Sequence, residues 1–207
     1  MAMRRILRRI KRLVLRQTWE QYSVDEWNRQ YLSSTWQYLA DLEQVPRYAV
    51  IDGWRRHLKP AGSILDLGCG EGTLFEHIAS SRTPVSYTGV DVSRVAVDAA
   101  TKKIRDPANE RFVCADLVMF EPAIGMPFDV IVFNEVLYYV PDPVAVARRY
   151  LAMLAPEGIV IVSVFSENRR AWNAINSVLE HQCLQKIAVR DTRSGKQWYL
   201  AAYGPRN

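Results

Sequence analysis

Five short apolar runs alternate with helical patterns along the middle of the chain, and this alternation restricts the fold more than any other feature. The runs lie at 63–67, 86–90, 111–115, 128–133 and 158–164. Helical patterns separate them at about 71–80, 93–104 and 142–154. Because runs such as VIVF and IVIVSV are apolar nearly throughout, they predict parallel strands that helices cover on both faces.

The end of the chain has a different pattern. A last helix is expected near 168–182, and two strands follow it at 185–192 and 196–203. The link around Ser194 and Gly195 is so short that these two strands have to run antiparallel. The sequence therefore predicts an α/β fold with a mostly parallel sheet and an antiparallel hairpin at its end.

The loop after the first strand carries three glycines at alternate positions, Gly68, Gly70 and Gly72, between Asp66 and Glu71. Glycines allow the backbone to turn tightly and to approach a ligand closely. The spacing is G-x-G-x-G, whereas the dinucleotide fingerprint is G-x-G-x-x-G. Two acids would repel a pyrophosphate but suit a cationic ligand. S-adenosylmethionine, which carries a sulfonium and an ammonium group, matches this requirement.

Acids or amides also follow the next three strands. Asp91 ends the second strand, where a carboxylate can accept from both hydroxyls of a ribose, and Asp116 follows the third, where it can accept from an adenine amino group. Asn134 and Glu135 follow the fourth. The carboxyl ends of parallel strands share one edge of a sheet, so these side chains are expected to line a single site.

These motifs resemble those of the class I S-adenosylmethionine-dependent methyltransferases, of the small type 11 and type 12 kind. The resemblance rests on LDLGCGEGTL, GVDVS, NEVLYYVPDP and LAPEGIVIVS, and covers about residues 60–165 together with the closing hairpin. A looser likeness links the NEVLYYVPDP and KQWYLAAYGPRN stretches to the nodulation N-methyltransferases. The family implies a Rossmann-like sheet of seven strands in the order 3-2-1-4-5-7-6, with strand seven antiparallel.

The resemblance also implies which residues bind S-adenosylmethionine. Asp66, Gly68 and Gly70 would hold its methionine end together with Cys69, and Asn134 would lie beside that end. Asp91 and its neighbour Val92 would hold the ribose. Asp116 and the backbone amide of Leu117 would hold the adenine.

Methyl transfer requires alignment of the acceptor with the methyl carbon, and a general base only where the acceptor loses a proton. Many relatives carry a histidine where this chain has Tyr139, so the identity of a base stays open. Glu135, Tyr138 and Tyr139 are the candidate catalytic residues. For all three, the start of a helix with aromatic packing is the alternative interpretation, and for Tyr139 it is the favoured one.

An aromatic-rich segment, 18–59, precedes the methyltransferase region, 60–207, and forms one compact domain with it in this interpretation. A capping box at Ser23 and Glu26 predicts a helix whose apolar face continues to Leu42. Together with the stretch after the fifth strand, this segment is expected to cover the substrate. The candidate substrate-binding residues are Tyr22, Tyr31, Tyr138, Arg169 and Trp172.

Residues 1–17 predict a basic amphipathic helix. Residues 1–16 hold seven basic residues and no acid, and the apolar residues fall on one arc. Such a segment suits the surface of an anionic membrane or a partner, and packing on its own domain or organelle targeting are the alternatives. If the segment binds a membrane, the protein is expected to lie peripherally on the cytoplasmic face of that membrane.

Composition excludes several other classes of protein. Outside residues 1–16 the chain has 20 basic against 22 acidic residues, so its body shows no basic excess of the kind that binds nucleic acid. Three scattered cysteines and three scattered histidines predict no disulfide framework and no metal site, and they favour the cytoplasm. No apolar stretch approaches the roughly 20 residues of a membrane-spanning helix.

Two functions from different classes remain open at this stage. The first is an enzyme that transfers a methyl group from S-adenosylmethionine to an oxygen or nitrogen of a small molecule or glycan intermediate. The second is a non-catalytic scaffold that binds S-adenosylmethionine and docks a membrane or protein partner through its basic helix.

Overall fold

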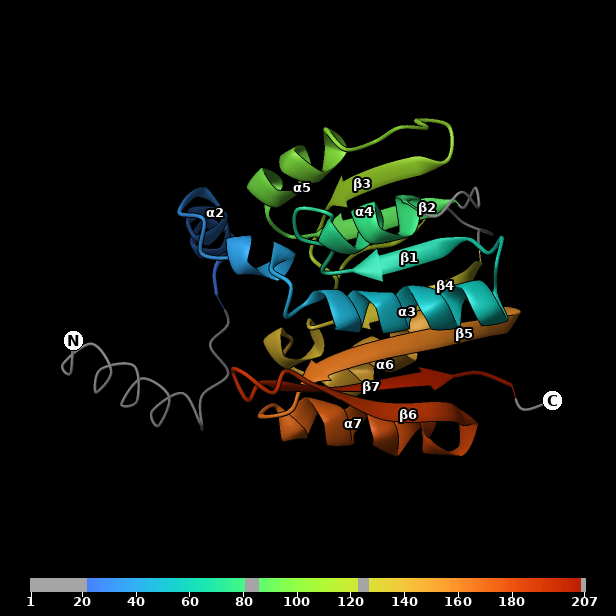
Figure 1. Cartoon of the computed structure of the whole chain (residues 1–207). Coiled ribbons are helices and arrows are strands. Elements are labelled where there is room, and N and C mark those ends of the chain that lie inside the picture. Colours follow the sequence, from blue (N-terminus) through green and yellow to red (C-terminus); the bar gives the residue numbers. More distant parts are fainter. Residues whose placement is uncertain (1–21, 81–85, 123–126, 206–207) are drawn as a thin grey trace.

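A seven-stranded sheet forms the centre of the computed structural model, which describes residues 22–80, 86–122 and 127–205 (Figure 1). The strand order is β3-β2-β1-β4-β5-β7-β6, as predicted, and β7 pairs with both neighbours in the antiparallel sense. The strands are β1 Ile64–Leu67, β2 Tyr87–Asp91, β3 Glu110–Cys114, β4 Phe128–Asn134, β5 Leu154–Phe165, β6 Cys183–Arg190 and β7 Gln197–Tyr203.

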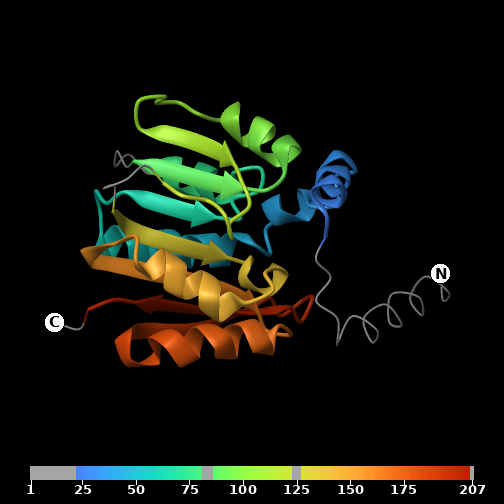
Figure 2. The same cartoon turned by 180° about the vertical axis from the view of Figure 1, so that it is seen from behind.

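Helices cover both faces of the sheet (Figures 1 and 2). Ile64, Val130 and Val132 pack on one face against α3 (Val45–Leu58) and α4 (Thr73–Ala79). Leu65 and Ile131 pack on the other face against α6 (Pro143–Leu151) and α7 (Arg169–Leu179). Because successive strand residues point to opposite faces, strands covered on both sides have to be apolar at nearly every position, which explains the runs in the sequence.

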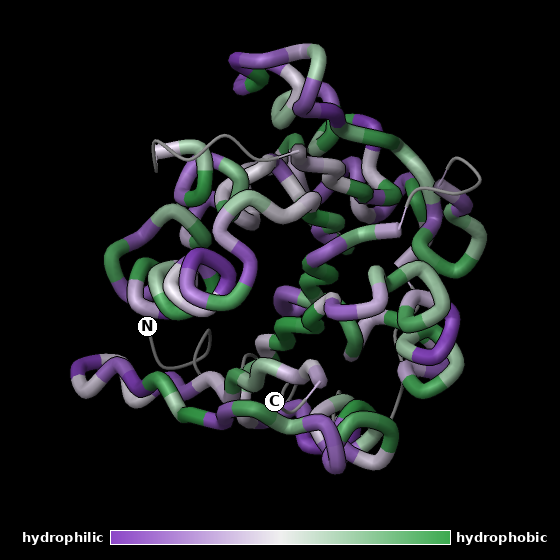
Figure 3. Tube along the Cα trace, turned by 90° about the vertical axis from the view of Figure 1, so that its right-hand side faces the viewer, coloured by the Kyte–Doolittle hydropathy of each residue, from purple (hydrophilic) through white to green (hydrophobic). Residues whose placement is uncertain are grey.

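The described residues form two further helices and three 3₁₀ turns. They are α2 Val24–Leu32, α5 Arg94–Thr101 and the 3₁₀ turns η1 Gln37–Ala40, η2 Leu137–Tyr139 and η3 Glu180–Gln182. Figure 3 looks along the strands and shows hydrophobic segments grouped at the centre, with hydrophilic segments mostly in the outer turns. None of the helices in the described ranges is long and apolar enough to cross a membrane.

The aromatic segment differs from the expected helix. Ser23 caps α2 as predicted, since its hydroxyl accepts from the Glu26 amide, but α2 ends at Leu32. The Ser33 hydroxyl donates to a backbone carbonyl within the helix, and Ser34 adopts a left-handed φ of 59°. Hydroxyl side chains that bond the local backbone compete with a helix in this way. The prediction of an apolar helical face to Leu42 was therefore wrong, and the Leu42 side chain is 75% exposed.

The segment divides into two parts with different positions. Helix α3 packs on the sheet, whereas α2 and η1 lie beyond the carboxyl ends of the parallel strands, at the left of Figure 1. We call α2 and η1 the cap. The predicted amphipathic helix and its membrane contact fall in residues 1–17, which lie outside the described residues.

Candidate active site between the sheet edge and the cap

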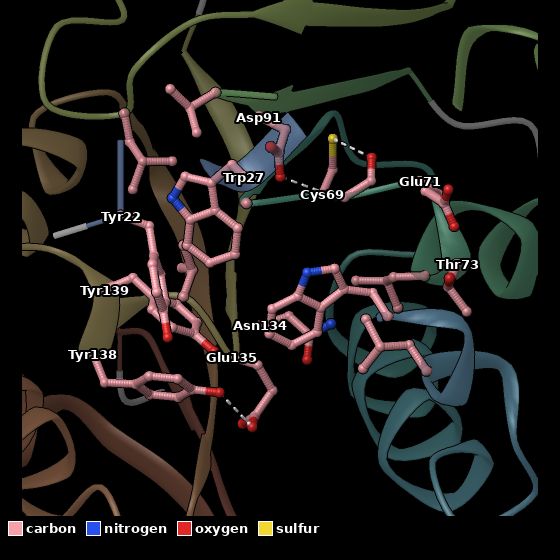
Figure 4. Close-up of a pocket in the computed structure, with 18 of the residues that line it drawn as sticks. Tyr22, Trp27, Cys69, Glu71, Thr73, Asp91, Asn134, Glu135, Tyr138 and Tyr139 are labelled. Atoms are coloured by element: carbon pink, nitrogen blue, oxygen red, sulfur yellow. Dashed lines mark hydrogen bonds between the residues drawn. The ribbon is translucent and has the colours of Figure 1, made fainter. Parts of the chain in front are cut away.

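A cavity of about 820 Å³ lies between the carboxyl ends of the strands and the cap. Its lining includes all but three of the predicted site residues: Tyr22, Tyr31, Gly68, Cys69, Gly70, Asp91, Val92, Asp116, Leu117, Asn134, Glu135, Tyr138 and Tyr139. In Figure 4, Cys69 and Glu71 lie on one side of this cavity, Tyr22, Tyr138 and Tyr139 on the other, and Asn134 and Glu135 between them. A cofactor side and an aromatic side thus share one space.

The glycine loop has the conformation that its spacing predicts. Gly68, Gly70 and Gly72 all adopt left-handed φ values, of 72°, 54° and 78°. The amides of Gly68 and Cys69 both donate to the Val90 carbonyl, at 2.8 and 3.0 Å. These bonds tie the loop to β2 and leave the backbone open towards the cavity. The buried Cys69 thiol has a pKa raised by its removal from water.

Asp91 organises the centre of the cofactor side. Its two carboxylate oxygens accept from the amides of Gly70 and Ser93, each at 2.9 Å. Burial raises the pKa of Asp91, and these backbone donors oppose the rise because they stabilise the ionised form. The carboxylate thereby joins the glycine loop to the start of α5 at the end of β2.

Asp116 and Leu117, the residues predicted to bind the adenine, lie just after β3. The Asp116 carboxylate accepts from the Val118 amide at 2.8 Å, and the Leu117 carbonyl accepts from the Tyr150 hydroxyl at 2.7 Å. These bonds fix the turn after β3. Both residues line the cavity.

Asp66 lies beneath the cavity and does not line it. It is 1% exposed, it accepts a hydrogen bond from the Tyr87 hydroxyl, and its other carboxylate oxygen has no partner among the described residues. Burial raises the pKa of Asp66 to about 7, against the lowering effects of Tyr87 and Arg47. A buried carboxylate with a free oxygen stabilises a cation that approaches it.

Replacement of Asp66 by asparagine is expected to stabilise the ligand-free protein by about 4 kcal/mol at pH 8. The pKa of Asp66 in the folded protein, about 7, lies above the ordinary value of 3.8. The free energy of unfolding therefore decreases as the pH rises from the lower to the higher of these values. Urea unfolding of both proteins from pH 4 to 8 measures the effect. The gain should fall below about 1 kcal/mol near pH 4, where the Asp66 carboxyl of the folded protein is neutral, and a gain of equal size at pH 4 and pH 8 would contradict this explanation.

Gly68 tolerates no side chain. A Cβ there would lie 2.5 Å from a Val136 methyl, in a left-handed conformation that L-residues avoid. We expect Gly68→Ala to lower the free energy of unfolding by about 3 kcal/mol, from strain and overpacking together. Gly53→Ala in α3 is the matched control, because nothing lies within 4 Å of its Cβ position. Denaturant unfolding of both variants checks this, and equal effects would contradict it.

Arg47 is the main residue of the site that the sequence did not indicate. It is 1% exposed in α3, and its guanidinium donates to Asn134, to the Gln44 side chain at 2.9 Å and to the Tyr48 hydroxyl at 3.2 Å. Its Nε has no partner among the described residues. These acceptors are uncharged, so the cavity contains a buried positive charge that a ligand carboxylate could neutralise. An arginine after a proline gives no signal by itself.

Glu135 forms the floor between the two sides. Its carboxylate accepts from the Tyr138 hydroxyl at 2.9 Å and from the Ser163 hydroxyl at 3.1 Å. Burial raises the pKa of Glu135, while the positive charge of Arg47 lowers it. Its φ of 61° is rare for a residue with a side chain, and such strain concentrates at functional sites.

Aromatic rings form the wall opposite the cofactor side. The Trp27 ring meets Tyr139 edge-on at 4.9 Å between centroids and lies 5.8 Å from the nearly parallel Trp36 ring. Tyr22 lies 5.2 Å from Trp27. Tyr139 thus packs against the cap, which agrees with the interpretation of this residue as aromatic packing. Burial raises the pKa of the Tyr139 phenol.

The structure places Arg169 and Trp172 outside the cavity lining. Trp172 is turned onto the β6–β7 hairpin, with its ring 5.3 Å from that of Tyr199. The residue beside them that does reach the cavity is Asn168, and Lys196 of the hairpin joins it there. The sequence indicated the right segment but not which side of α7 faces the site.

Comparison with known proteins identifies the family of the chain. Residues 27–204 match the family described as a methyltransferase domain. The ubiquinone biosynthesis O-methyltransferase of Neisseria meningitidis is 28% identical over 144 residues, which are 67% of this chain and 58% of that protein. The chain therefore spans little more than half the length of this curated relative.

Two groups of solved structures share the fold. The N-methyltransferase NodS from Bradyrhizobium japonicum, in complex with S-adenosylhomocysteine, aligns with a TM-score of 0.67 at 22% identity, over 83% of this chain and 92% of NodS. The plantazolicin methyltransferase BpumL, in complex with a substrate analogue and S-adenosylhomocysteine, aligns with a TM-score of 0.68 at 16% identity. The alignment covers 97% of this chain and 99% of BpumL. The predicted fold and cofactor type agree with these complexes, and the chain belongs to the methyltransferase domain family.

Proposed function

We propose that this protein transfers a methyl group from S-adenosylmethionine to an oxygen or nitrogen atom of a small acceptor that carries an aromatic or sugar ring. The observation that carries the proposal is the two-sided cavity. Acids at the strand ends line one side, aromatic rings line the other, and Glu135 lies between them. A donor and an acceptor held in this way would meet at the floor of the cavity.

The residues of the cofactor side fit S-adenosylmethionine. Asp91 is placed to accept from ribose hydroxyls, and the free oxygen of Asp66 lies beneath a loop without side chains at its glycines. Arg47 supplies a complementary charge for the carboxylate of the methionine end. When bound, the cofactor supplies a methyl group activated by a positive sulfur.

Glu135 is the proposed general base for an acceptor that loses a proton. Burial raises its pKa above the ordinary value, which makes the carboxylate a stronger base, and its bonds from Tyr138 and Ser163 fix the direction of the carboxylate. Tyr138 is a positioning residue in this scheme. Trp27, Tyr139 and their neighbours exclude water and present ring faces, which suit an aromatic ring or the apolar face of a sugar.

The names of the relatives support this class of acceptor without selecting one member. They include an O-methyltransferase of ubiquinone biosynthesis, an N-methyltransferase and a plantazolicin methyltransferase. Phenolic oxygens, aromatic amines and amino sugars are therefore the acceptors to test first, with glycan intermediates included.

Incubation with methyl-labelled S-adenosylmethionine and each acceptor class tests the proposal. Acceptor-dependent formation of S-adenosylhomocysteine, with label in one acceptor, is expected. A cell extract of the source organism widens the panel. Tight cofactor binding without transfer to any acceptor would support the alternative, a non-catalytic scaffold.

We propose from the sequence alone that residues 1–16 attach the protein to anionic membrane surfaces. Each basic residue near such a surface contributes about 1 kcal/mol, so the attachment should be reversible and sensitive to salt. Liposome co-sedimentation of the full chain and of a chain without residues 1–16 tests this. Equal sedimentation of the two at low salt would remove the proposal.

A further inference from the structure

Helix α2 contacts both the cofactor side and the aromatic side of the cavity. Trp27 and Asn28 are adjacent, Tyr31 follows about one turn later, and all three partly buried side chains face the sheet edge. Trp27 meets the aromatic side, Asn28 meets the loop after β2, and Tyr31 meets the glycine loop. A single short helix therefore joins the cofactor side to the aromatic side.

Asn28 makes the polar contact between the cap and the cofactor side. Its side-chain oxygen accepts from the Ser93 hydroxyl at 2.7 Å and from the Val95 amide at 3.4 Å. The amide of the same Ser93 donates to Asp91 at 2.9 Å. One residue, Ser93, thus links Asn28 to the Asp91 carboxylate that is proposed to hold the ribose.

Tyr31 makes a second contact with the cofactor side. Its hydroxyl lies 2.9 Å from the position that a Cβ on Gly70 would occupy, and the Gly70 amide donates to the other oxygen of Asp91. Burial raises the pKa of the Tyr31 phenol, and Asp91 adds to the rise. The helix consequently touches both neighbours of the Asp91 carboxylate, Gly70 and Ser93.

Little else restrains α2. It has nine residues, none of them fully buried, and its main packing partner is α5, which begins at Arg94 directly after Ser93. A helix this short is marginal without tertiary contacts, so its position depends on the few contacts that it makes. Ordering of the loop between Asp91 and Ser93 should therefore also order α2.

We propose that α2 couples the two sides of the cavity, with Asn28 as the positioning residue that carries the coupling. On this view, which rests on the proposed function, occupation of the cofactor side fixes Ser93 and through it Asn28. The helix then holds Trp27 against Tyr139 and completes the acceptor wall. Cofactor and acceptor binding strengthen each other, because coupling between two sites is reciprocal.

Hydrogen exchange of the α2 amides, residues 24–32, with and without saturating S-adenosylhomocysteine tests the coupling in the full chain. In the wild type, S-adenosylhomocysteine should slow this exchange about fivefold, a change typical of one hydrogen bond. In Asn28→Ala the slowing should disappear, and the dissociation constant of S-adenosylhomocysteine should rise about fivefold. Alanine is a better helix former than asparagine, so loss of the helix does not explain this result.

Two further variants serve as controls. Arg29→Ala alters the next residue of the same helix, on its exposed side, and should behave as the wild type. Asn28→Asp retains an oxygen that accepts from Ser93 and Val95, and should keep most of the slowing.

Three results would overturn the proposal, and each has a different consequence for the proposed function. Equal slowing in the wild type and Asn28→Ala would show that the coupling does not pass through Asn28. Binding of S-adenosylhomocysteine without slowing in the wild type would remove the coupling and leave the proposed function intact. An absence of binding to the wild type, measured by calorimetry, would remove the proposed function and the coupling with it.

Discussion

Asp91→Ala is expected to weaken the binding of S-adenosylhomocysteine at least about 100-fold. The substitution removes the proposed ribose acceptor, and hydrogen bonds to a charged group contribute roughly 1.5–3 kcal/mol each. It also leaves the amides of Gly70 and Ser93 without their acceptor, so the glycine loop and the start of α5 are no longer held together. Isothermal titration of both proteins with S-adenosylhomocysteine measures the difference.

Asp98→Ala is the control for this prediction. Asp98 is another carboxylate of the same region, but its side chain is 62% exposed and its nearest cation, on Arg94, is 4.0 Å away. Its removal should leave the affinity unchanged. If the two variants bound S-adenosylhomocysteine equally well, the cofactor side would be assigned to the wrong residues.

Glu135→Gln is expected to lower kcat by about 10²–10⁴-fold for an acceptor that has to lose a proton. Glutamine is close in shape and still accepts from a hydroxyl, but it takes up no proton. Because burial disfavours the ionised carboxylate, the neutral side chain should not reduce the free energy of unfolding. Steady-state kinetics together with a melting curve separate loss of the base from loss of structure.

The pH dependence provides a second test of Glu135. A base acts when ionised, and burial raises its pKa, so wild-type activity should fall as the pH decreases through a value above the ordinary 4.5. Tyr138→Phe removes one donor to the carboxylate and should shift this inflection upwards with a smaller loss of kcat. A Glu135→Gln enzyme with the wild-type rate and pH profile would exclude Glu135 as the base.

The sheet could be predicted from the sequence because burial on both faces dictates nearly continuous apolar strands. The same logic placed Asp91, Asp116 and Asn134 together, since residues at the carboxyl ends of neighbouring parallel strands share an edge whatever the details of packing. Glycines at alternate positions predicted the left-handed turns, because few other residues adopt them.

Other features depend on contacts between distant parts of the chain. Arg47 precedes Asn134 by 87 positions, and nothing local distinguishes it from an exposed arginine of α3. Asn28 and Ser93 lie 65 positions apart in the sequence. The end of α2 at Leu32 was missed because hydrophobic spacing continues beyond it, although Ser33 and Ser34 bend the backbone.

The orientation of a surface helix was a further limit. Arg169 and Trp172 lie in a segment that does reach the site through Asn168, but the hairpin β6–β7 offers Trp172 a better apolar partner. Which side of α7 faces the cavity follows from that packing and not from the composition of the helix.

A crystal structure of the full chain with S-adenosylhomocysteine tests the central claim most directly. The account predicts the adenine beside Asp116 and Leu117, the ribose hydroxyls on Asp91 and the carboxylate within reach of Arg47. The sulfur should then face Glu135 and the aromatic wall. A ligand bound elsewhere, or one whose sulfur faces away from Glu135, would contradict it.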